Sequence, residues 1–380
     1  MPVCVSVPRE TAPGERRVAS TPEVVQRLTK AGVEVRVQSG AGSSAFYTDD
    51  AFTKAGAKIV GERRDVIAAA DVLLKVQPPS VEEVGWMKPG AVVVGFMNPT
   101  RALDSVASLR DRKLTAFSME LVPRITRAQV MDALSSQANV AGYESVLLGA
   151  EACPKYFPML TTAAGTVRPA KVLIMGAGVA GLQAIATARR LGAIVEAYDV
   201  RREAGEQVRS LGAKFLELEI DAKGSGGYAR ELTAEEKVKQ QALVSQAVAD
   251  ADVAITTANV PGRKAPRLID KDMVGRMRPG SVIVDLAAES GGNCELTRPG
   301  ETVETGGVTI LGPLNLPSRL AFHSSQLYAK NLQAFLELLI GKDGKLVTSY
   351  ADEILAASVL VTQGEVKYAP TRDLLQGAPK

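Results

Sequence analysis

Short apolar runs alternate with longer amphipathic segments over residues 1–120. Two segments, residues 21–31 and 81–87, have the spacing of apolar positions that is typical of helices. Ser20 and Thr21, followed by Pro22 and Glu23, predict that the first of these helices starts with a hydroxyl cap. Between the helices, runs rich in valine and leucine predict strands over residues 3–8, 33–38, 72–76, 91–96 and 114–119. Such strands, separated by helices, indicate a parallel sheet covered on both faces.

A second series of the same kind begins near residue 171. Its predicted strands cover residues 171–175, 194–198, 253–256, 281–285 and 308–311, and a polar loop and a long helix over residues 135–152 precede it. The predicted helix 318–339 leaves this series with no further strand, so we expect it to cross back to the first domain. We therefore predict a discontinuous first domain, residues 1–134 plus 319–380, and an inserted second domain, residues 135–318.

The predicted fold class is α/β, with two Rossmann-like, doubly wound parallel-sheet domains that flank a nucleotide cleft. A content of 46% hydrophobic and 23% charged residues excludes a mainly disordered chain. The net charge of +3 is too small for a dedicated nucleic-acid or membrane-surface binder. Cys4, Cys153 and Cys294 are far apart, which argues against a disulfide scaffold or a metal site. With no visible signal segment and no stretch of about 20 apolar residues, we expect a soluble protein.

One connection in the second series is unusually long. Residues 217–240 start with a polar, glycine-rich stretch that contains Gly224, Gly226, Gly227 and Tyr228, and they continue as a charged helix. A connection between a strand and a helix usually needs about two to six residues. This segment is therefore either a disordered insertion or a mobile lid.

The strongest chemical signal is the turn Gly176-Ala-Gly-Val-Ala-Gly181. It follows an apolar strand and opens a helix, which is the context that a dinucleotide-binding turn requires. The first glycine permits the tight turn, the second lets the backbone approach a pyrophosphate, and the third lets helix and strand pack closely. The phosphates would lie at the positive end of the helix. The alternative is a turn whose glycines are incidental.

Asp199 ends the next predicted strand, 18 residues beyond Gly181. A carboxylate there can accept hydrogen bonds from the adenosine ribose and repel a 2′-phosphate, so the sequence favours NAD over NADP. Arg201 and Arg202 could instead recruit that phosphate. We interpret both arginines as solvated residues in the first turn of the next helix.

A second polar group lies between the two predicted domains. Basic, amide, acidic and hydroxyl side chains are packed into residues 124–137, including Arg124, Arg127, Gln129, Asp132 and Ser135. Such a set offers both donors and acceptors and can hold a carboxamide and a ribose. The alternative is a helix cap with surface charges.

The chain has one histidine, His323, in a segment that is predicted to be helical. Dehydrogenases acting on hydroxy or amino acids usually need a general acid–base, most often histidine. We expect His323 to lie on a helix surface or a domain contact, away from the glycine-rich turn. Lys75, at the end of a predicted strand, is a candidate substitute.

Several further stretches, together with these motifs, carry a resemblance to a known family. They are Pro8-Arg-Glu, Gly14-Glu-Arg-Arg-Val-Ala, Met119-Glu-Leu-Val-Pro-Arg-Ile-Thr-Arg-Ala-Gln, Asp132-Ala-Leu-Ser-Ser-Gln, Thr162-Ala-Ala-Gly-Thr-Val, Gly227-Tyr228-Ala, Thr256-Thr-Ala, Asp285-Leu-Ala-Ala-Glu-Ser-Gly-Gly-Asn and Asn315-Leu-Pro-Ser-Arg. Over nearly its whole length the chain resembles the NAD(H)-binding component of proton-translocating NAD(P)+ transhydrogenase, a relative of alanine dehydrogenase. The loop over residues 124–137 combined with the Gly227-Tyr228 loop is specific to this family.

The resemblance implies direct hydride transfer between NAD(H) on this chain and NADP(H) on a partner. Arg124, Asp132 and Ser135 would orient the nicotinamide carboxamide, and Gln129 would reach the ribose region where the two nucleotides meet. Val179 would lie against the pyrophosphate, Asp199 would take the adenosine ribose, and Tyr228 would sit on a closing loop. The full set of implied nucleotide-binding residues is Gly176, Gly178, Val179, Ala180, Gly181, Asp199, Val200 and Tyr228.

The resemblance also implies partners and a location. Members of the family form a homodimer of this component, which pairs with an NADP(H)-binding domain of the beta subunit and with membrane-spanning subunits that translocate protons. The chain would then be cytoplasmic and peripheral on the inner face of the cell membrane. No nucleic acid is implied.

Alanine dehydrogenase is the alternative enzyme. That family carries a histidine after the fifth strand of the first domain, where this chain has Gly95-Phe-Met-Asn98, and an aspartate where this chain has Glu289. Arg17 and Lys75 match positions that bind the substrate in those dehydrogenases, and we interpret them as inherited scaffold. Without the histidine no acid–base group is evident for oxidising an amine, which favours transhydrogenation. A non-catalytic NAD-binding module is a third possibility.

Overall fold

The computed structural model describes residues 2–217, 234–259, 264–341, 344–347 and 349–377. The chain divides into two compact units. The first consists of Met1–Gln137 and Pro317–Lys380, and the second of Ala138–Leu316. The first unit is thus built from both ends of the chain, with the second inserted between them.

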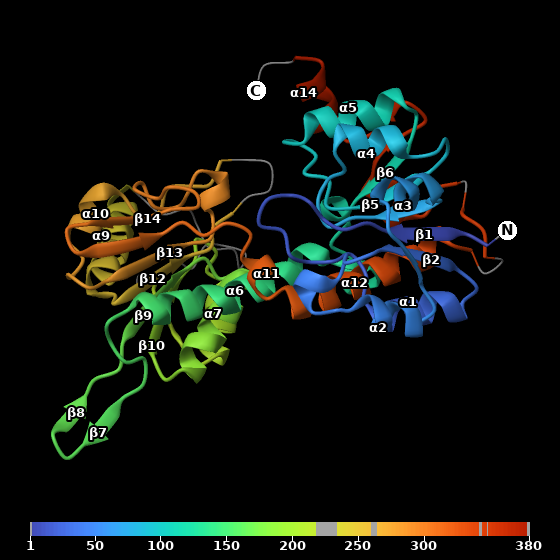
Figure 1. Ribbon diagram of the computed structural model, residues 1–380. Helices are drawn as coiled ribbons and strands as arrows, with labels where there is room; N and C mark the ends of the chain where they lie inside the picture. The colour runs from blue at the N-terminus through green and yellow to red at the C-terminus, as the bar shows by residue number, and fades with distance from the viewer. Residues whose placement is uncertain (1, 218–233, 260–263, 342–343, 348, 378–380) are drawn as a thin grey trace. The chain divides into compact units, whose positions relative to one another are not determined.

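The first unit contains an eight-stranded sheet with the order β17-β16-β6-β5-β4-β1-β2-β3 (Figure 1). All neighbours pair in parallel except β16, which is antiparallel to both β6 and β17. The strands are β1 (Cys4–Val7), β2 (Glu34–Gln38), β3 (Lys58–Val60), β4 (Val72–Leu74), β5 (Val92–Gly95), β6 (Thr115–Ser118), β16 (Val359–Thr362) and β17 (Glu365–Val366).

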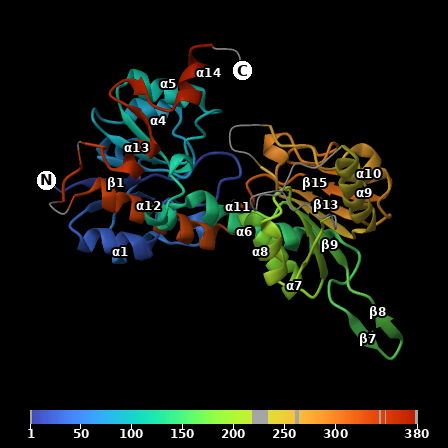
Figure 2. The same cartoon turned by 180° about the vertical axis from the view of Figure 1, so that it is seen from behind.

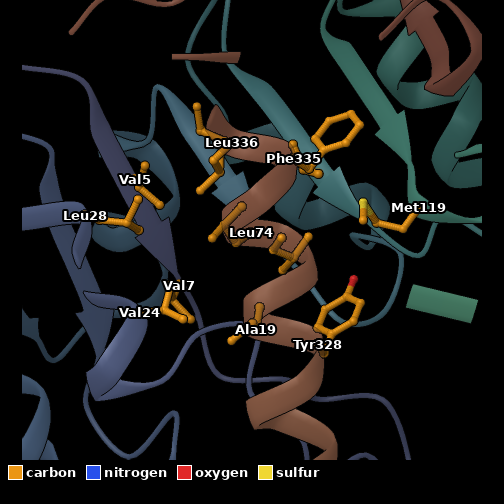
Figure 3. Close-up of a cluster of buried hydrophobic side chains, with 14 of the residues drawn as sticks. Val5, Val7, Ala19, Val24, Leu28, Leu74, Met119, Tyr328, Phe335 and Leu336 are labelled. Atoms are coloured by element: carbon orange, nitrogen blue, oxygen red, sulfur yellow. The ribbon is translucent and has the colours of Figure 1, made fainter. Parts of the chain in front are cut away.

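Helices bury apolar side chains on both faces of this sheet. One face packs under residues of α1 and α12, and the other under residues of α3, α4 and α5. Figure 3 shows Tyr328, Phe335 and Leu336 of α12 in the same cluster of buried apolar side chains as Leu74 of β4. The helices are α1 (Pro22–Lys30), α2 (Asp49–Lys54), α3 (Arg63–Ala69), α4 (Val81–Trp86), α5 (Leu103–Asp111), α12 (Ala321–Leu339), α13 (Glu353–Ser358) and α14 (Ala369–Leu375).

The second unit contains a seven-stranded sheet with the order β11-β10-β9-β12-β13-β15-β14. Among these described strands, only β14 runs antiparallel to its neighbour. The strands are β9 (Lys171–Met175), β10 (Ile194–Tyr198), β11 (Lys214–Phe215), β12 (Val253–Thr256), β13 (Val282–Asp285), β14 (Thr302–Thr305) and β15 (Val308–Leu311), and the helices of this unit include α7 (Val179–Arg190), α8 (Ala204–Ser210), α9 (Ala234–Asp250) and α10 (Lys271–Gly275).

A short hairpin, β7 (Leu160–Thr162) and β8 (Gly165–Val167), forms a separate two-stranded sheet in this unit. Both views show it reaching away from the body of the unit (Figures 1 and 2). All of its strand residues are exposed. It was not predicted.

The predicted α/β class, with two Rossmann-like and mostly parallel sheets, is confirmed. Two local details differ from the prediction. The long helix α6 (Ala133–Ala152) begins two residues before the predicted start at Ser135. Thr21 is the N-cap of α1, but its side chain accepts no hydrogen bond from the helix, so the predicted hydroxyl cap is wrong. The Thr21 side chain is buried, and its hydroxyl has no hydrogen-bond partner among the described residues. Across the residues that the structure describes, no helix is long and apolar enough to span a membrane.

Candidate functional site

The glycine-rich turn lies at the switch point of the second unit's sheet. β9 has β10 on one side and β12 on the other, and the turn leads from the end of β9 into α7. In open α/β sheets, ligands bind outside the carboxyl ends of the strands where the strand order reverses. Residues 176–181 therefore occupy the place where this class of fold binds ligands.

The three glycines of the turn meet different local requirements. Gly176 has a φ of +107°, in the left-handed region that favours glycine. At Gly181, a Cβ atom would lie 1.8 Å from the carbonyl oxygen of Gly176, so only glycine lets the helix pack on the turn. A Cβ atom at Gly178 would meet nothing within 4 Å, which leaves room for an approaching ligand.

The start of α7 offers backbone N–H groups at this open position. Gly178 is the N-cap and has extended backbone geometry, and no side chain caps the helix there. Val179 is exposed and Ala180 is half-buried. The first N–H groups of a helix have no partner within the helix, and together with the helix dipole they favour an anion.

Two residues that the sequence analysis gave no role hold this turn in place. The hydroxyl of Thr257, just after β12, donates to the carbonyl oxygen of Gly176 over 3.0 Å. A Cβ atom at Gly142 would lie 2.1 Å from the carbonyl oxygen of Ala180, so α6 passes directly against the start of α7. A threonine at a strand end and a glycine inside a long helix were the available signals, and both are common without such a role.

The carboxylate of Asp199 lies at the end of β10 beside the glycine-rich turn. Its Oδ2 atom accepts a hydrogen bond of 2.7 Å from the backbone N–H of Ala177. Burial works against its ionisation, but hydrogen bonds from the Arg201 side chain, the Arg201 backbone and Ala177 outweigh this and lower the pKa of Asp199. The carboxylate is therefore ionised at neutral pH. Val200 follows it and is exposed.

Arg201 differs from its interpretation as a solvated helix residue. It lies before α8, and its Nε atom is 3.0 Å from Oδ1 of Asp199. Its Nη2 atom also donates to Oδ2 of the same carboxylate. This pair forms in the connection between β10 and α8, whose path the apolar patterns of the strand and the helix do not predict.

The predicted polar group within residues 124–137 belongs to the first unit. Arg124 and Gln129 are exposed, and among the described residues their side chains have no hydrogen-bond or ion-pair partner. Gln129 lies in the short 3-10 helix η3 (Thr126–Met131). Arg127 of the same helix pairs instead with Asp352 and Glu353, so it is held within the unit.

Asp132 and Ser135 form one local hydrogen-bonded group. The backbone N–H of Ser135 donates to Oδ1 of Asp132 over 2.8 Å, and its hydroxyl donates to Oδ2 over 2.6 Å. This is the arrangement of an acidic residue that caps the start of α6. The cap and a role in ligand binding are compatible, because the hydroxyl oxygen of Ser135 keeps acceptor capacity.

Arg17 and Lys75 are buried in ion pairs of the first unit. Arg17 is 2.7 Å from Oε2 of Glu15, and its Nη1 atom donates to Gln137 over 2.8 Å. Burial works against the ionisation of Glu15, but the side-chain hydrogen bond from Arg17 outweighs this effect. The pKa of Glu15 is thereby lowered to about 2. Lys75 lies 2.9 Å from Glu10 and 3.1 Å from Glu83. Both cations are thus neutralised by carboxylates of the chain.

At the two positions where the sequence differs from alanine dehydrogenases, the segment after β5 and Glu289, the structure shows hydrogen bonds to other parts of the chain. After β5, the backbone N–H groups of Met97 and Asn98 donate to the carboxylate of the half-buried Glu120 over 3.0 and 2.8 Å, and Asn98 has a φ of +43°. In the second unit, Glu289 accepts a hydrogen bond from the backbone of Asn315 over 2.7 Å. Glu120 was missed because its partners are 22 and 23 residues away in the chain.

The predicted site residues fall in both units. In the second unit, Asp199 contacts the glycine-rich turn and Val200 follows it. In the first unit, Asp132 contacts Ser135, whereas no contact joins the side chains of Arg124 and Gln129 to this pair among the described residues. His323 is exposed on α12, where its ring lies edge-on to Phe322. Tyr228 and the glycines beside it lie outside the described residues.

Comparisons with known proteins cover both units. The N-terminal domain model of the family alanine dehydrogenase/PNT matches residues 6–141, and the C-terminal domain model matches residues 145–369. The chain belongs to the alanine dehydrogenase/PNT family.

Relatives from both branches of the alanine dehydrogenase/PNT family are similar to the chain. A Rhodospirillum rubrum protein named as the first part of NAD(P) transhydrogenase subunit alpha is 48% identical over 372 residues, which cover 95% of this chain and 97% of the relative. The crystal structure of transhydrogenase from Sinorhizobium meliloti is 47% identical and has a TM-score of 0.88, covering 96% of this chain and 99% of that one. A solved L-alanine dehydrogenase is 27% identical with a TM-score of 0.83, covering 99% and 100%. Identity is thus higher to the transhydrogenases.

Proposed function

We propose that this chain is the NAD(H)-binding component of an NAD(P) transhydrogenase and that hydride passes directly between NAD(H) on this chain and NADP(H) on a partner subunit. The observation that carries the proposal is the open glycine-rich turn at the switch point of the second sheet, with the ionised carboxylate of Asp199 beside it. The names and identities of the transhydrogenase relatives support it.

The turn fits a dinucleotide. The pyrophosphate would lie against the backbone of Gly178 and Val179 at the start of α7. Asp199 would accept hydrogen bonds from the adenosine ribose, with Ala180 and Val200 lining the same place. Its negative charge would repel a 2′-phosphate, so NAD(H) is the expected occupant and NADP(H) belongs to the partner.

Hydride transfer between two nicotinamides needs no proton donor or acceptor. The hydride leaves C4 of one reduced nicotinamide and bonds to C4 of the oxidised one, so NADPH and NAD+ become NADP+ and NADH, or the reverse. What the protein must supply is orientation of the two rings and exclusion of water. A single histidine, exposed on α12, is consistent with this chemistry.

The residues proposed to orient the nicotinamide belong to the first unit. Arg124 and the Asp132–Ser135 group would hold the carboxamide, because together they present charged donors and hydroxyl and carboxylate acceptors. Gln129, which is exposed in η3, would reach the ribose region at the junction with NADP(H). These four residues make up the proposed catalytic set.

The proposed partners follow from the same function. They are an NADP(H)-binding beta subunit domain, membrane-spanning subunits that couple the reaction to proton translocation, and a second copy of this chain. The chain would be cytoplasmic and held at the inner face of the cell membrane by those subunits. Support for a homodimer comes from the β7–β8 hairpin, where Leu160 and Val167, with Met159 just before β7, expose apolar side chains.

An alanine dehydrogenase-like activity is the second candidate, favoured by the 27% identical structure. Its substrate would have to reach Arg17 and Lys75, which are buried and already paired with carboxylates. The segment after β5 has no histidine, and its backbone is held by Glu120. These contacts support a scaffold role for both cations.

The test mixes the purified chain with the NADP-binding domain of a related transhydrogenase, NADPH and an oxidised NAD analogue whose reduction absorbs at its own wavelength. We expect reduction that requires both proteins. Absence of reduction with a panel of such domains, while NADH still binds, would contradict direct transfer. Alanine-dependent reduction of NAD+ by the chain alone would establish the dehydrogenase instead.

A further inference from the structure

The carboxylate of Asp199 has its hydrogen-bonding capacity filled by the chain itself. Oδ1 accepts from the backbone N–H of Arg201 over 2.8 Å and from its Nε–H over 3.0 Å. Oδ2 accepts from the backbone of Ala177 over 2.7 Å and from Nη2 of Arg201 over 3.0 Å. A carboxylate has about four acceptor positions, so none is left for a further donor.

The four donors are not equally fixed. The N–H groups of Ala177 and Arg201 belong to backbone next to the glycine-rich turn and β10, so they stay where the fold puts them. The other two donors are the guanidinium of Arg201, whose side chain is 62% exposed, whereas that of Asp199 is 6% exposed. A ligand that needs the carboxylate can therefore displace only the guanidinium.

We propose that Arg201 acts as an internal competitor for the ribose site, in which its guanidinium covers Asp199 in the nucleotide-free chain and the adenosine ribose hydroxyls displace it when NAD(H) binds. This inference rests on the proposed function, because it takes Asp199 as the ribose acceptor. A vicinal diol supplies two O–H donors, which match in number the two N–H donors that leave.

Two consequences follow for nucleotide choice. Arg201 lowers the affinity for NAD(H), because binding must first break a bidentate ion pair. The guanidinium of Arg201 also compensates the charge of Asp199, so without it this negative charge repels a 2′-phosphate more strongly. Arg201 would thus weaken NAD(H) binding and lower the ratio of the affinity for NAD(H) to the affinity for NADP(H).

The test compares Arg201→Ala with Arg202→Ala, which removes the same charge from the neighbouring position without removing a hydrogen bond to Asp199. Calorimetric titration should show NADH binding about 2- to 5-fold tighter in Arg201→Ala, the range expected for a half-exposed ion pair. The ratio of NADH to NADPH affinity should rise. Arg202→Ala should change neither, and Arg201→Lys, which cannot form the bidentate contact, should fall between the wild type and Arg201→Ala.

A second measurement reads the displacement directly. In the nucleotide-free chain, the Nε–H of Arg201 should be protected from hydrogen exchange by Asp199, and NADH should abolish this protection. In an Asp199→Asn background the carboxylate is gone, so the tightening caused by Arg201→Ala should disappear.

The outcomes separate the inference from the function. If the wild-type chain binds no NADH, the proposed function itself fails. If NADH binds and Arg201→Ala binds it equally or more weakly, or if the Nε–H stays protected in the complex, Arg201 is not a competitor and only this inference is overturned.

Discussion

Ser135 donates both its backbone N–H and its hydroxyl to the carboxylate of Asp132, at 2.8 and 2.6 Å. Asp132 thereby caps the start of α6. Further along the same helix, Gly142 packs against the start of α7, the helix that follows the glycine-rich turn. One acidic side chain is thus both a structural cap and a member of the group proposed to orient the nicotinamide.

Asp132→Ala should lower the free energy of unfolding by about 1 kcal/mol, because the cap is lost, and should also slow hydride transfer. Urea titration and the transhydrogenation assay measure the two effects. Asp132→Asn is the matched variant, since asparagine caps about as well as aspartate but carries no charge. A variant with normal stability and normal transfer at this position would rule out a role for the carboxylate in catalysis.

Gln129→Ala should slow hydride transfer more than it weakens NADH binding, because its proposed partner lies at the junction of the two nucleotides. Single-turnover rates measured with the NADP-binding partner, compared with NADH affinity from calorimetry, test this split. Gln26→Ala, the same change on the exposed surface of α1, serves as the control. Equal losses in rate and affinity would make Gln129 an ordinary binding residue.

Gly181→Ala should destabilise the second unit by about 3 kcal/mol, since its Cβ atom would lie 1.8 Å from the carbonyl oxygen of Gly176. Gly178→Ala should leave stability unchanged or slightly raised, because there is room for its Cβ atom and its φ of −80° suits alanine. That variant should nevertheless bind NADH more weakly, because a methyl group then stands where the pyrophosphate approaches. Thermal unfolding with and without NADH distinguishes the two effects, and normal NADH binding by Gly178→Ala would place the phosphates elsewhere.

Asp199→Ala should weaken NADH binding by about 1.5–3 kcal/mol, because the ribose hydroxyls lose a charged acceptor. Calorimetric titration with NADH measures the change. Glu196→Ala, at a half-buried acidic position earlier in β10, is the control for removing a carboxylate from this strand. Unchanged affinity in Asp199→Ala would mean that the adenosine ribose lies elsewhere.

The stability of the first unit should fall in acid because of Glu15. Its folded pKa of about 2 lies below the ordinary value of 4.5, so its contribution is complete above pH 5 and is lost as the pH falls toward 2. A depression of this size corresponds to about 3 kcal/mol. Glu120 acts in the opposite direction, since burial raises its pKa and protonation then relieves a cost.

The comparison of wild type with Glu15→Gln isolates the contribution of Glu15 to the loss of stability in acid. Urea unfolding at pH 7 and pH 3 should show a difference between the two proteins that shrinks in acid. A difference that is the same at pH 7 and pH 3 would mean that folding does not lower the pKa of Glu15.

Much of the fold could be predicted because its signals are local. Parallel strands such as β4 and β12 are buried on both faces, so they appear in the sequence as continuous apolar runs. Residues 359–361 are also apolar and buried, but so short a run does not distinguish a strand from a helix, and the partner strand β6 lies far away in the sequence. The exposed hairpin β7–β8 has no buried face and hence no apolar pattern to detect.

The sequence by itself determined the glycine-rich turn and the acid at the end of the following strand, because a turn, a helix start and a strand end depend on neighbours in the chain. Only the tertiary structure decided what surrounds them. Thr257 reaches the turn from 81 residues away, and Arg17 meets Gln137 across 120 residues. Even the pairing of Arg201 with Asp199, two residues apart, required the path of the backbone beyond β10. Side-chain direction follows from where the packed fold leaves room and a partner, and spacing along the chain does not contain that information.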